Sequence, residues 1–285
     1  MIKTKYIFLE KKSTPEIKVF ETIRGENNIK EYLYKIKFYL PMMKLILYNK
    51  PEIFPKKSLY IFNSPCTLCD YTSLCNETYE DDFNTVEVKK DKLFISPTDI
   101  IQFEMCPRAW GYKKEGIYPI KKKGILEAGT CLHYAIESFL IDQKDPVKAF
   151  EEKWETIDFN GIEFSKRESP ELIKEIAINL LKQFPKFWEK QSLEVLSTEE
   201  RTYIGLDDSV IFSGAWDLLC KEKNGENEVI IDFKFSSPNG DDSVMKWLHN
   251  SDQVTGYALC LLHKKDPNTS KKLIKEVLFE NNRSQ

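Results

Sequence analysis

Hydrophobic side chains recur along this chain at two different spacings, and the spacing predicts whether each stretch is a strand or a helix. Near the amino end, KYIFL (5–9) and IKVFETI (17–23) are apolar and β-prone, and a proline-containing turn separates them. This pattern predicts a pair of strands. Residues 27–48 instead carry apolar side chains at helical spacing, although Pro41 is expected to kink or break the helix that they predict.

A polar segment interrupts this pattern, and a second series of elements follows it. Residues 76–92, NETYEDDFNTVEVKKDK, are charged, show little periodicity and therefore predict a linker. The next helix begins near SPTDII, where Ser96 or Thr98 provides the cap. Beyond it, the pattern predicts helices at 126–141, across 146–191 and at 252–263, and strands at 193–204, 210–220 and 228–235, with a hairpin turn at 223–227. Helices that flank a small sheet make the predicted fold class α/β.

Composition and charge narrow the class of protein without choosing a function. At 285 residues the chain can bury the core of one large domain or of two small ones. Its 41% hydrophobic and 31% charged residues are typical of a globular protein in water. With no run of about 18 apolar residues and no apolar leader, we expect a cytoplasmic protein without a membrane span. The net charge of −3 neither favours nor excludes nucleic acid as a partner.

The stretch SGAWDLLCKEKNGENEVIIDFKF (213–235) carries the most specific chemistry. It places Asp217 on one predicted strand and Asp232 and Lys234 on the next. Alternate residues of a strand share a face, so Asp232 and Lys234 are expected to point the same way. Two carboxylates bind a hard cation such as Mg²⁺, which polarises a phosphate and activates water, and a lysine neutralises charge on the scissile phosphate. A salt-bridged surface hairpin is the alternative, since D-x-K is common by chance.

Three further motifs accompany D-x-K: G-x3-H ends at His133, G-x2-D joins Gly214 to Asp217, and Q-x3-Y joins Gln253 to Tyr257. In this order the four motifs resemble the RecB-like branch of the PD-(D/E)XK nuclease superfamily. SPTDIIQFEMCPRAW also resembles the start of that branch, where a cysteine precedes Pro-Arg. The resemblance implies a restriction-endonuclease-like core, with a small central mixed sheet flanked by helices, and here a helical insertion and a cysteine loop stapled by an Fe–S cluster.

The resemblance also implies a metal site that uses Mg²⁺ or Mn²⁺. Its ligands would be His133, Asp217 and Asp232, with the Phe233 carbonyl as a further one. The implied reaction is hydrolysis of DNA phosphodiester bonds.

The same resemblance assigns roles to three other side chains and names a substrate. Lys234 would position the attacking water and stabilise the transition state, and Gln253 and Tyr257 would orient the active site or the DNA backbone. The substrate would be single-stranded DNA or DNA with free ends, and the enzyme would act as an exonuclease. CRISPR adaptation proteins and recombination proteins are the protein partners that such nucleases suggest.

Seven cysteines in a cytoplasmic setting are expected to be free thiols or metal ligands. In the iron–sulfur members of the branch, including the RecB-like nucleases associated with CRISPR systems, one cysteine precedes the nuclease motifs and a C-x2-C-x5-C triplet follows them. Four thiolates match a [4Fe–4S] cluster, and a four-cysteine zinc site is the alternative. The residues that fit this pattern are Cys106 for the first position and Cys66, Cys69 and Cys75 for the triplet. Three others are predicted to be core thiols, namely Cys131, Cys220 and Cys260.

The order of the segments differs from that of the family. Residues 1–75 resemble the C-terminal third of such a nuclease but come first here, 76–92 would be the linker, and 93–285 resemble the N-terminal and catalytic part. We therefore expect residues 1–285 to form a single, circularly permuted nuclease domain, in which the linker joins the old termini. A remnant of a tandem nuclease is the alternative account of 1–75.

Aromatic and basic residues around the CPRAW helix raise a further expectation. A mixture of this kind would serve base stacking beside a phosphate track, and ordinary core packing of the rings explains it equally well. The candidate DNA contacts are Trp110, Lys113, Lys114, Lys121, Lys122 and Lys123, with Tyr112 and Tyr118 nearby. A non-catalytic subunit that binds DNA ends or joins a recombination complex is the rival function, and loss of the D-x-K set would be its signature.

Overall fold

The computed structural model describes residues 1–12, 14–56, 66, 69–76, 83–120, 122–165, 168–225, 227–236 and 251–279. The chain forms two compact units, and each unit is assembled from three separate segments of the sequence. Unit 1 contains Met1–Arg24, Lys121–Glu200 and Ala215–Ser251, and unit 2 contains Gly25–Ile120, Arg201–Gly214 and Asp252–Gln285. Neither unit is a continuous stretch of chain, so long-range pairing and not sequence order defines them.

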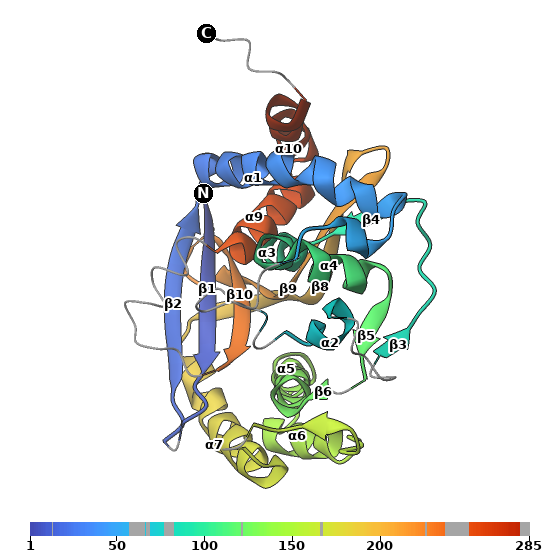
Figure 1. Ribbon diagram of the computed structural model, residues 1–285. Helices are drawn as coiled ribbons and strands as arrows, with labels where there is room; N and C mark the ends of the chain where they lie inside the picture. The colour runs from blue at the N-terminus through green and yellow to red at the C-terminus, as the bar shows by residue number, and fades with distance from the viewer. Residues whose placement is uncertain are drawn as a thin grey trace. The chain divides into compact units, whose positions relative to one another are not determined.

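Unit 1 is built on a mixed sheet in the strand order β2-β1-β10-β9 (Figure 1). β1 (Ile2–Leu9) runs antiparallel to β2 (Ile17–Arg24), which confirms the strand pair predicted at the amino end. On its other side β1 runs parallel to β10 (Glu228–Phe235), and β10 is antiparallel to β9 (Val210–Glu222). Both strands of the predicted hairpin are therefore confirmed.

Three helices of unit 1 pack on one another and on this sheet. They are α5 (Gly124–Asp142), α6 (Pro146–Trp154) and α7 (Pro170–Glu189), and α5 contacts β10 while α7 contacts β2. The side chains of Asp145 and Ser169 cap α6 and α7, and a proline follows each cap, which is why these helices begin where they do. Their common core joins helix and sheet side chains, among them Leu132, Phe150, Phe184, Ile7, Leu218 and Ile231.

Three further strands involve unit 1. The short strands β6 (Lys122–Lys123) and β7 (Ile162–Glu163) pair in parallel. The long strand β8 (Leu193–Asp207) pairs with β9, and both β8 and β9 contribute residues to the two units. β8 follows α7 directly and carries the polar segment STEERT (197–202).

Helices form most of unit 2. α1 (Glu26–Lys44), α3 (Pro97–Met105) and α10 (Pro267–Ile274) each pack against α9 (Asp252–Lys265), as Figure 1 shows. The smaller elements are η1 (Leu45–Leu47), η2 (Pro51–Ile53), α2 (Thr72–Cys75), β3 (Phe83–Thr85), β4 (Leu93–Ile95), α4 (Pro107–Lys114), β5 (Ile117–Pro119) and η4 (Lys275–Phe279). Of these, β4 pairs in parallel with the first residues of β9, and β3 pairs antiparallel with β5.

The structure decides between the two caps predicted for the helix at 97–105. Ser96 Oγ accepts a hydrogen bond of 3.3 Å from the backbone N–H of Asp99, and the Asp99 carboxylate accepts one of 2.9 Å from the backbone N–H of Ser96. This reciprocal pair is a capping box. Ser96 is therefore the cap, and Thr98 lies inside the first turn.

Two local expectations change with the structure. Pro41 does not end α1, which continues to Lys44, because the buried side chains of Leu40 and Met43 hold that turn in place. The predicted linker 76–92 contains the paired strand β3, although residues 77–82 lie outside the described part of the chain. None of the helices in the described part is both long and apolar enough to span a membrane.

Candidate active site

Asp217, Asp232 and Lys234 lie on β9 and β10, just beyond the last paired residues of these two strands, Leu218 and Ile231. Asp217 Oδ2 accepts a hydrogen bond of 2.7 Å from the backbone N–H of Phe233. On β10, Lys234 Nζ lies 2.5 Å from Asp232 Oδ2, so the two side chains share a face as predicted. Asp232 is 1% exposed, and burial of this kind leaves its charge poorly screened by water. The hairpin thus concentrates two carboxylates and one ammonium group.

Two further side chains reach Asp217 from other elements of unit 1. His133 of α5 has its Nδ1 3.6 Å from Asp217 Oδ1 and 3.8 Å from Glu199 Oε1 of β8. One ligand atom from each of these three residues lies within 4.8 Å of the others. Such spacing is close to that around a single divalent cation, whose bonds to nitrogen and oxygen are about 2.0–2.2 Å long.

Glu199 is the member of this group that sequence reasoning missed. It lies in the polar segment STEERT (197–202), where a second glutamate follows it and strand alternation assigns a role to neither. In the structure its φ is +46°, a left-handed conformation that side-chain-bearing residues rarely adopt. Strained backbone of this kind collects at functional sites. No local sequence signal reports it, because the strain arises from tertiary packing.

Burial and repulsion between carboxylates control the charge of the group. Burial raises the pKa of Asp217, and the charge of Asp232 raises it further, to about 7. Burial acts to lower the pKa of the imidazole of His133, but the neighbouring carboxylates outweigh it, and the pKa lies above its usual value. The site therefore gathers more negative charge than it readily holds at neutral pH. A divalent cation would relieve that repulsion.

The space next to these residues is small and polar on one side. A cavity of 10 Å³ is lined by His133, Glu199 and Asp217, together with Glu137 and Thr198 and four apolar side chains. That volume is about the space that one water molecule or ion occupies. Carboxylate oxygens are the donors that Mg²⁺ and Mn²⁺ prefer. The donor set of His133, Glu199 and Asp217 therefore fits a cation of this kind, and Glu199 is a candidate donor that the predicted set did not include.

Lys234 has a second neighbour on the strand next to β10. Its Nζ lies 5.6 Å from the ring centre of Tyr6 on β1, and the register places Tyr6 opposite Asp232. Tyr6 Oη and Ser251 Oγ are 3.0 Å apart. Burial, followed by the charge of Asp232, raises the pKa of Tyr6 far above its usual value, so the phenol stays neutral. Its ring face therefore attracts the ammonium group and holds it beside the carboxylate.

Gln253 and Tyr257 lie in unit 2, one helical turn apart on α9. Gln253 Nε2 donates a hydrogen bond of 2.7 Å to Tyr257 Oη. Gly214, the glycine of G-x2-D, also belongs to unit 2, and a Cβ there would lie 2.8 Å from Cys260 Sγ and 3.3 Å from Tyr257 Cδ1. A glycine at this position thus lets β9 approach α9 closely. The other predicted catalytic and metal-binding residues lie in unit 1.

The four cysteines predicted as cluster ligands gather in unit 2. Cys106 lies between α3 and α4 in a small buried cluster with Tyr71, Ala109 and Tyr112, and Cys69 and Cys75 pack against this cluster. Cys66, Cys69 and Cys106 line a cavity of 310 Å³. Burial raises the pKa of Cys69, and the charges of the other three thiols raise it further.

The other three cysteines are core thiols, as predicted. Cys131, Cys220 and Cys260 are at most 1% exposed. Burial raises the pKa of Cys131 to about 11 and the pKa of each of the other two to about 12. All three are therefore protonated packing groups at neutral pH.

The lysines predicted to contact DNA are divided between the units. Lys113 and Lys114 lie on α4 in unit 2, whereas Lys122 and Lys123 form β6 in unit 1 and are exposed. Lys121 lies outside the described residues. The predicted set is therefore not one continuous patch of a single unit.

Trp110 is enclosed in the core of unit 2. Its ring is 0% exposed and packs edge-on against Phe54 and Phe103, while its Nε1 donates a hydrogen bond of 3.2 Å to Asp99 Oδ1. A ring covered on every side cannot stack on a base, so the predicted DNA contact at Trp110 is wrong. The alternative of core packing is the one that the structure adopts for this residue.

Comparison of the sequence with known proteins identifies the family to which this site belongs. No curated protein matches the chain. The profile of the PD-(D/E)XK nuclease superfamily does match it, over residues 95–283, which is about two thirds of its length. The matched span includes His133, the β9–β10 hairpin and the α9 pair, and the mixed sheet with its flanking helices agrees with the core of that superfamily. The chain therefore belongs to the PD-(D/E)XK nuclease superfamily.

Proposed function

We propose that this protein is a divalent-metal-dependent deoxyribonuclease, an exonuclease that acts on single-stranded DNA or on DNA ends. The convergence of Asp217, Asp232 and Lys234 on one hairpin, with His133 beside them, carries the proposal. A merely structural hairpin gains nothing from a buried carboxylate, Asp217, whose pKa is raised first by burial and then by the charge of Asp232. Membership of the superfamily supplies the reaction class, which is phosphodiester hydrolysis.

The metal would be Mg²⁺ or Mn²⁺. His133, Asp217 and Asp232 would hold it, with the Phe233 carbonyl as a further ligand. Glu199 would be an additional ligand, because its carboxylate lies with His133 and Asp217 in one group of possible donors. When bound, the cation polarises the scissile phosphate and lowers the pKa of a water molecule. Asp217 binds it only after losing its proton, so binding weakens as pH falls below about 7.

Other side chains would position the reactants and stabilise charge. The ammonium group of Lys234, held between Asp232 and the Tyr6 ring, would orient the attacking water and stabilise the negative charge that grows on the phosphate. Gln253 and Tyr257, joined by their hydrogen bond, would orient the active site or the DNA backbone.

A cleavage assay tests the proposal directly. Linear single-stranded DNA labelled at one end is expected to be degraded with Mg²⁺ or Mn²⁺ and to stay intact with a chelator. Closed circular single-stranded DNA is expected to resist, because an exonuclease needs an end. Cleavage of the circle would replace the exonuclease by an endonuclease. Binding of DNA ends without any cleavage would instead support the rival non-catalytic subunit.

We further propose that Cys66, Cys69, Cys75 and Cys106 hold a structural [4Fe–4S] cluster. A zinc ion with Zn–S bonds of about 2.3 Å brings its four sulfurs to about 3.8 Å from one another. The cavity of 310 Å³ lined by three of these cysteines has room for a group larger than a single ion, which favours the cluster. The cluster would tie the loop around α2 to the junction of α3 and α4.

We also propose that the segment order is a circular permutation. Residues 1–75 supply β1, which pairs with β10 in unit 1, and α1, which packs against α9 in unit 2. They therefore complete both units. A chain reordered to begin at residue 93, with 1–75 placed after residue 285, is expected to melt and to cleave DNA like the natural order. Loss of folding in the reordered chain would count against the permutation.

Manganese is expected to stabilise the protein more at about pH 8 than at about pH 5.5. The fold raises the pKa of Asp217 from 3.8 to about 7, so its contribution to the free energy of unfolding is fully present below pH 3.8 and is lost as pH rises to about 7. Above that pH the carboxylate is charged, and Mn²⁺ at 100 times its Kd would add about 2.7 kcal/mol. Thermal melts with and without Mn²⁺ measure the effect.

Asp217→Asn provides the decisive comparison for this prediction. The variant is expected to lose the Mn²⁺-induced rise in melting temperature, and to be more stable than the wild type at about pH 8 without metal, because the costly charge is gone. Glu189→Gln on the exposed end of α7 is the matched control and is expected to respond like the wild type. An unchanged Mn²⁺ response in Asp217→Asn would remove Asp217 from the metal site.

A further inference from the structure

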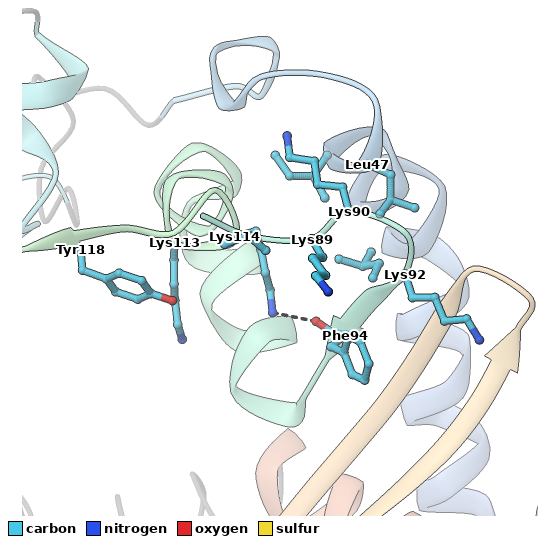
Figure 2. Close-up of a pocket in the computed structure, with 11 residues that line it drawn as sticks. Leu47, Lys89, Lys90, Lys92, Phe94, Lys113, Lys114 and Tyr118 are labelled. Atoms are coloured by element: carbon cyan, nitrogen blue, oxygen red, sulfur yellow. Dashed lines mark hydrogen bonds between the residues drawn. The ribbon is translucent and has the colours of Figure 1, made fainter. Parts of the chain in front are cut away.

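Unit 2 contains a pocket that combines an apolar floor with five lysines (Figure 2). Its volume is 210 Å³. Lys89, Lys90 and Lys92 come from the segment that leads into β4, and Lys113 and Lys114 come from the end of α4. The apolar part of the lining consists of Ile46, Leu47, Val88, Leu93, Phe94 and Tyr118. None of the residues that line this pocket is among the proposed catalytic or metal-binding residues.

Two of the five lysines are tied to the protein itself. Lys90 forms an ion pair with Glu115. Lys114 lies 2.9 Å from Asp99 Oδ1 and donates a hydrogen bond of 2.7 Å to the carbonyl of Phe94, the contact drawn in Figure 2. Burial lowers the pKa of Lys114. These two side chains therefore have structural roles at the wall of the pocket.

The remaining three lysines are available to a ligand. Within the described part of the chain, Lys89 and Lys92 are exposed and have no ion pair or hydrogen bond. Lys113 donates to the neutral Gln102 at 3.3 Å. Three ammonium groups without a carboxylate partner around one hollow create a local positive potential, although the whole chain carries a net charge of −3.

Two aromatic rings at this pocket are open to solvent. Phe94 is 48% exposed and Tyr118 is 42% exposed. Both rings therefore offer open aromatic surface beside lysines that have no carboxylate partner. A flat apolar group with an attached negative charge matches both features.

We propose that this pocket holds one nucleotide of a single-stranded nucleic acid, with phosphates on Lys89 and Lys92 and a base against Phe94 or Tyr118. The proposal deepens the proposed nuclease function and rests on it for the nature of the strand. A positively charged track with exposed aromatic faces is the arrangement by which proteins bind single strands without reading sequence. An acidic polypeptide would use the lysines but would leave both rings without a flat partner.

The proposal is tested by measuring how tightly the protein binds a fluorescent oligothymidylate of about 12 nucleotides. Fluorescence anisotropy reports the binding, and no divalent metal is added. The double variant Lys89→Gln, Lys92→Gln is expected to bind about 25-fold more weakly at 0.1 M salt. Its plot of log affinity against log salt is expected to be shallower by about 1.4. Both values follow from a slope of about −0.7 for each phosphate contact on a single strand.

A matched control separates the pocket from the general charge of the surface. Lys271→Gln, Lys272→Gln removes the same charge from two exposed lysines of α10, also in unit 2, and is expected to leave affinity and salt slope unchanged. Equal weakening in the two double variants would overturn the pocket. Circular dichroism and thermal melts of each variant establish that it is folded.

The stacking part of the proposal has its own readout. Phe94→Ala and Tyr118→Ala are each prepared, and at least one is expected to weaken oligothymidylate binding by about tenfold while leaving the binding of an abasic strand of equal length unchanged. If both bind the two strands like the wild type, no base stacks there. If polyglutamate displaces the oligonucleotide at equal charge concentration, the pocket is an acidic-polypeptide site and the proposal falls.

Cleavage measured on the same preparations keeps this proposal separate from the proposed nuclease. If the wild type cleaves DNA but the lysine variants bind normally, the pocket fails and the nuclease stands. If the wild type never cleaves but the binding results are as expected, the nuclease fails and the pocket stands.

Discussion

Replacing Lys234 by alanine or methionine is expected to slow metal-dependent cleavage of end-labelled single-stranded DNA by about 100- to 1,000-fold. The ammonium group lies 2.5 Å from Asp232 and over the ring of Tyr6, so it is fixed before substrate binds. A charge held in place costs no reorganisation when negative charge develops on the phosphate, which is why its removal affects the rate so strongly. Initial rates under saturating Mn²⁺ measure the effect.

Two comparisons make this result specific. Lys234→Met keeps most of the stem that lies over Tyr6, so equal losses in Lys234→Met and Lys234→Ala would assign the effect to charge and not to packing. Lys221→Ala removes an exposed lysine from β9 in the same unit and is expected to cleave at the wild-type rate. Wild-type rates in both Lys234 variants would refute the catalytic role of the hairpin.

If the proposed iron–sulfur cluster is present, replacing Cys106 by serine is expected to remove it and to lower iron from about four atoms per chain to less than about one. Cys106 is 8% exposed and lies between α3 and α4, in the buried cluster against which Cys69 and Cys75 pack. In the proposed cluster, Cys106 is the one thiolate of four that would tie these helices to the α2 loop. Iron analysis and the visible absorption of anaerobically purified protein measure the loss, and the melting temperature is expected to fall with it.

Cys131→Ala is the control for this prediction. Cys131 is a buried thiol in the helical core of unit 1, so its replacement is expected to leave iron content and colour unchanged. Iron retained in Cys106→Ser would exclude Cys106 as a ligand. A colourless wild type with one zinc per chain would replace the cluster by a zinc site.

Much of the candidate site follows from short-range patterns. A period of two places Asp232 and Lys234 on the same side of any strand, whatever the rest of the fold does. Ser96, a typical helix cap, directly precedes Pro97 and marks the start of α3. Helical spacing places Gln253 beside Tyr257. These features depend on the geometry of single elements. They could therefore be predicted from the sequence.

The residues that sequence reasoning missed depend on which elements meet. Glu199 joins His133 and Asp217 because β8 pairs with β9, and Tyr6 reaches Lys234 because β1 pairs with β10. The local pattern around each residue is that of an ordinary polar or apolar strand. Strands so far apart in the chain pair because the arrangement as a whole buries their apolar faces. The free energy of that burial depends on every element of the unit, so a short stretch of sequence does not reveal which strands pair.

The sequence by itself determined the chemical inventory of this protein: the hairpin carboxylates and lysine, the helix that bears His133, the four spaced cysteines and the family to which they point. Only the tertiary structure decided which of these side chains are exposed and which residues surround each of them. It enclosed Trp110 in a core while leaving Phe94 open beside Lys89 and Lys92. The reason is physical, since spacing along a helix or strand fixes the face on which a side chain lies, whereas the elements packed against that face determine whether water, protein or a ligand covers it.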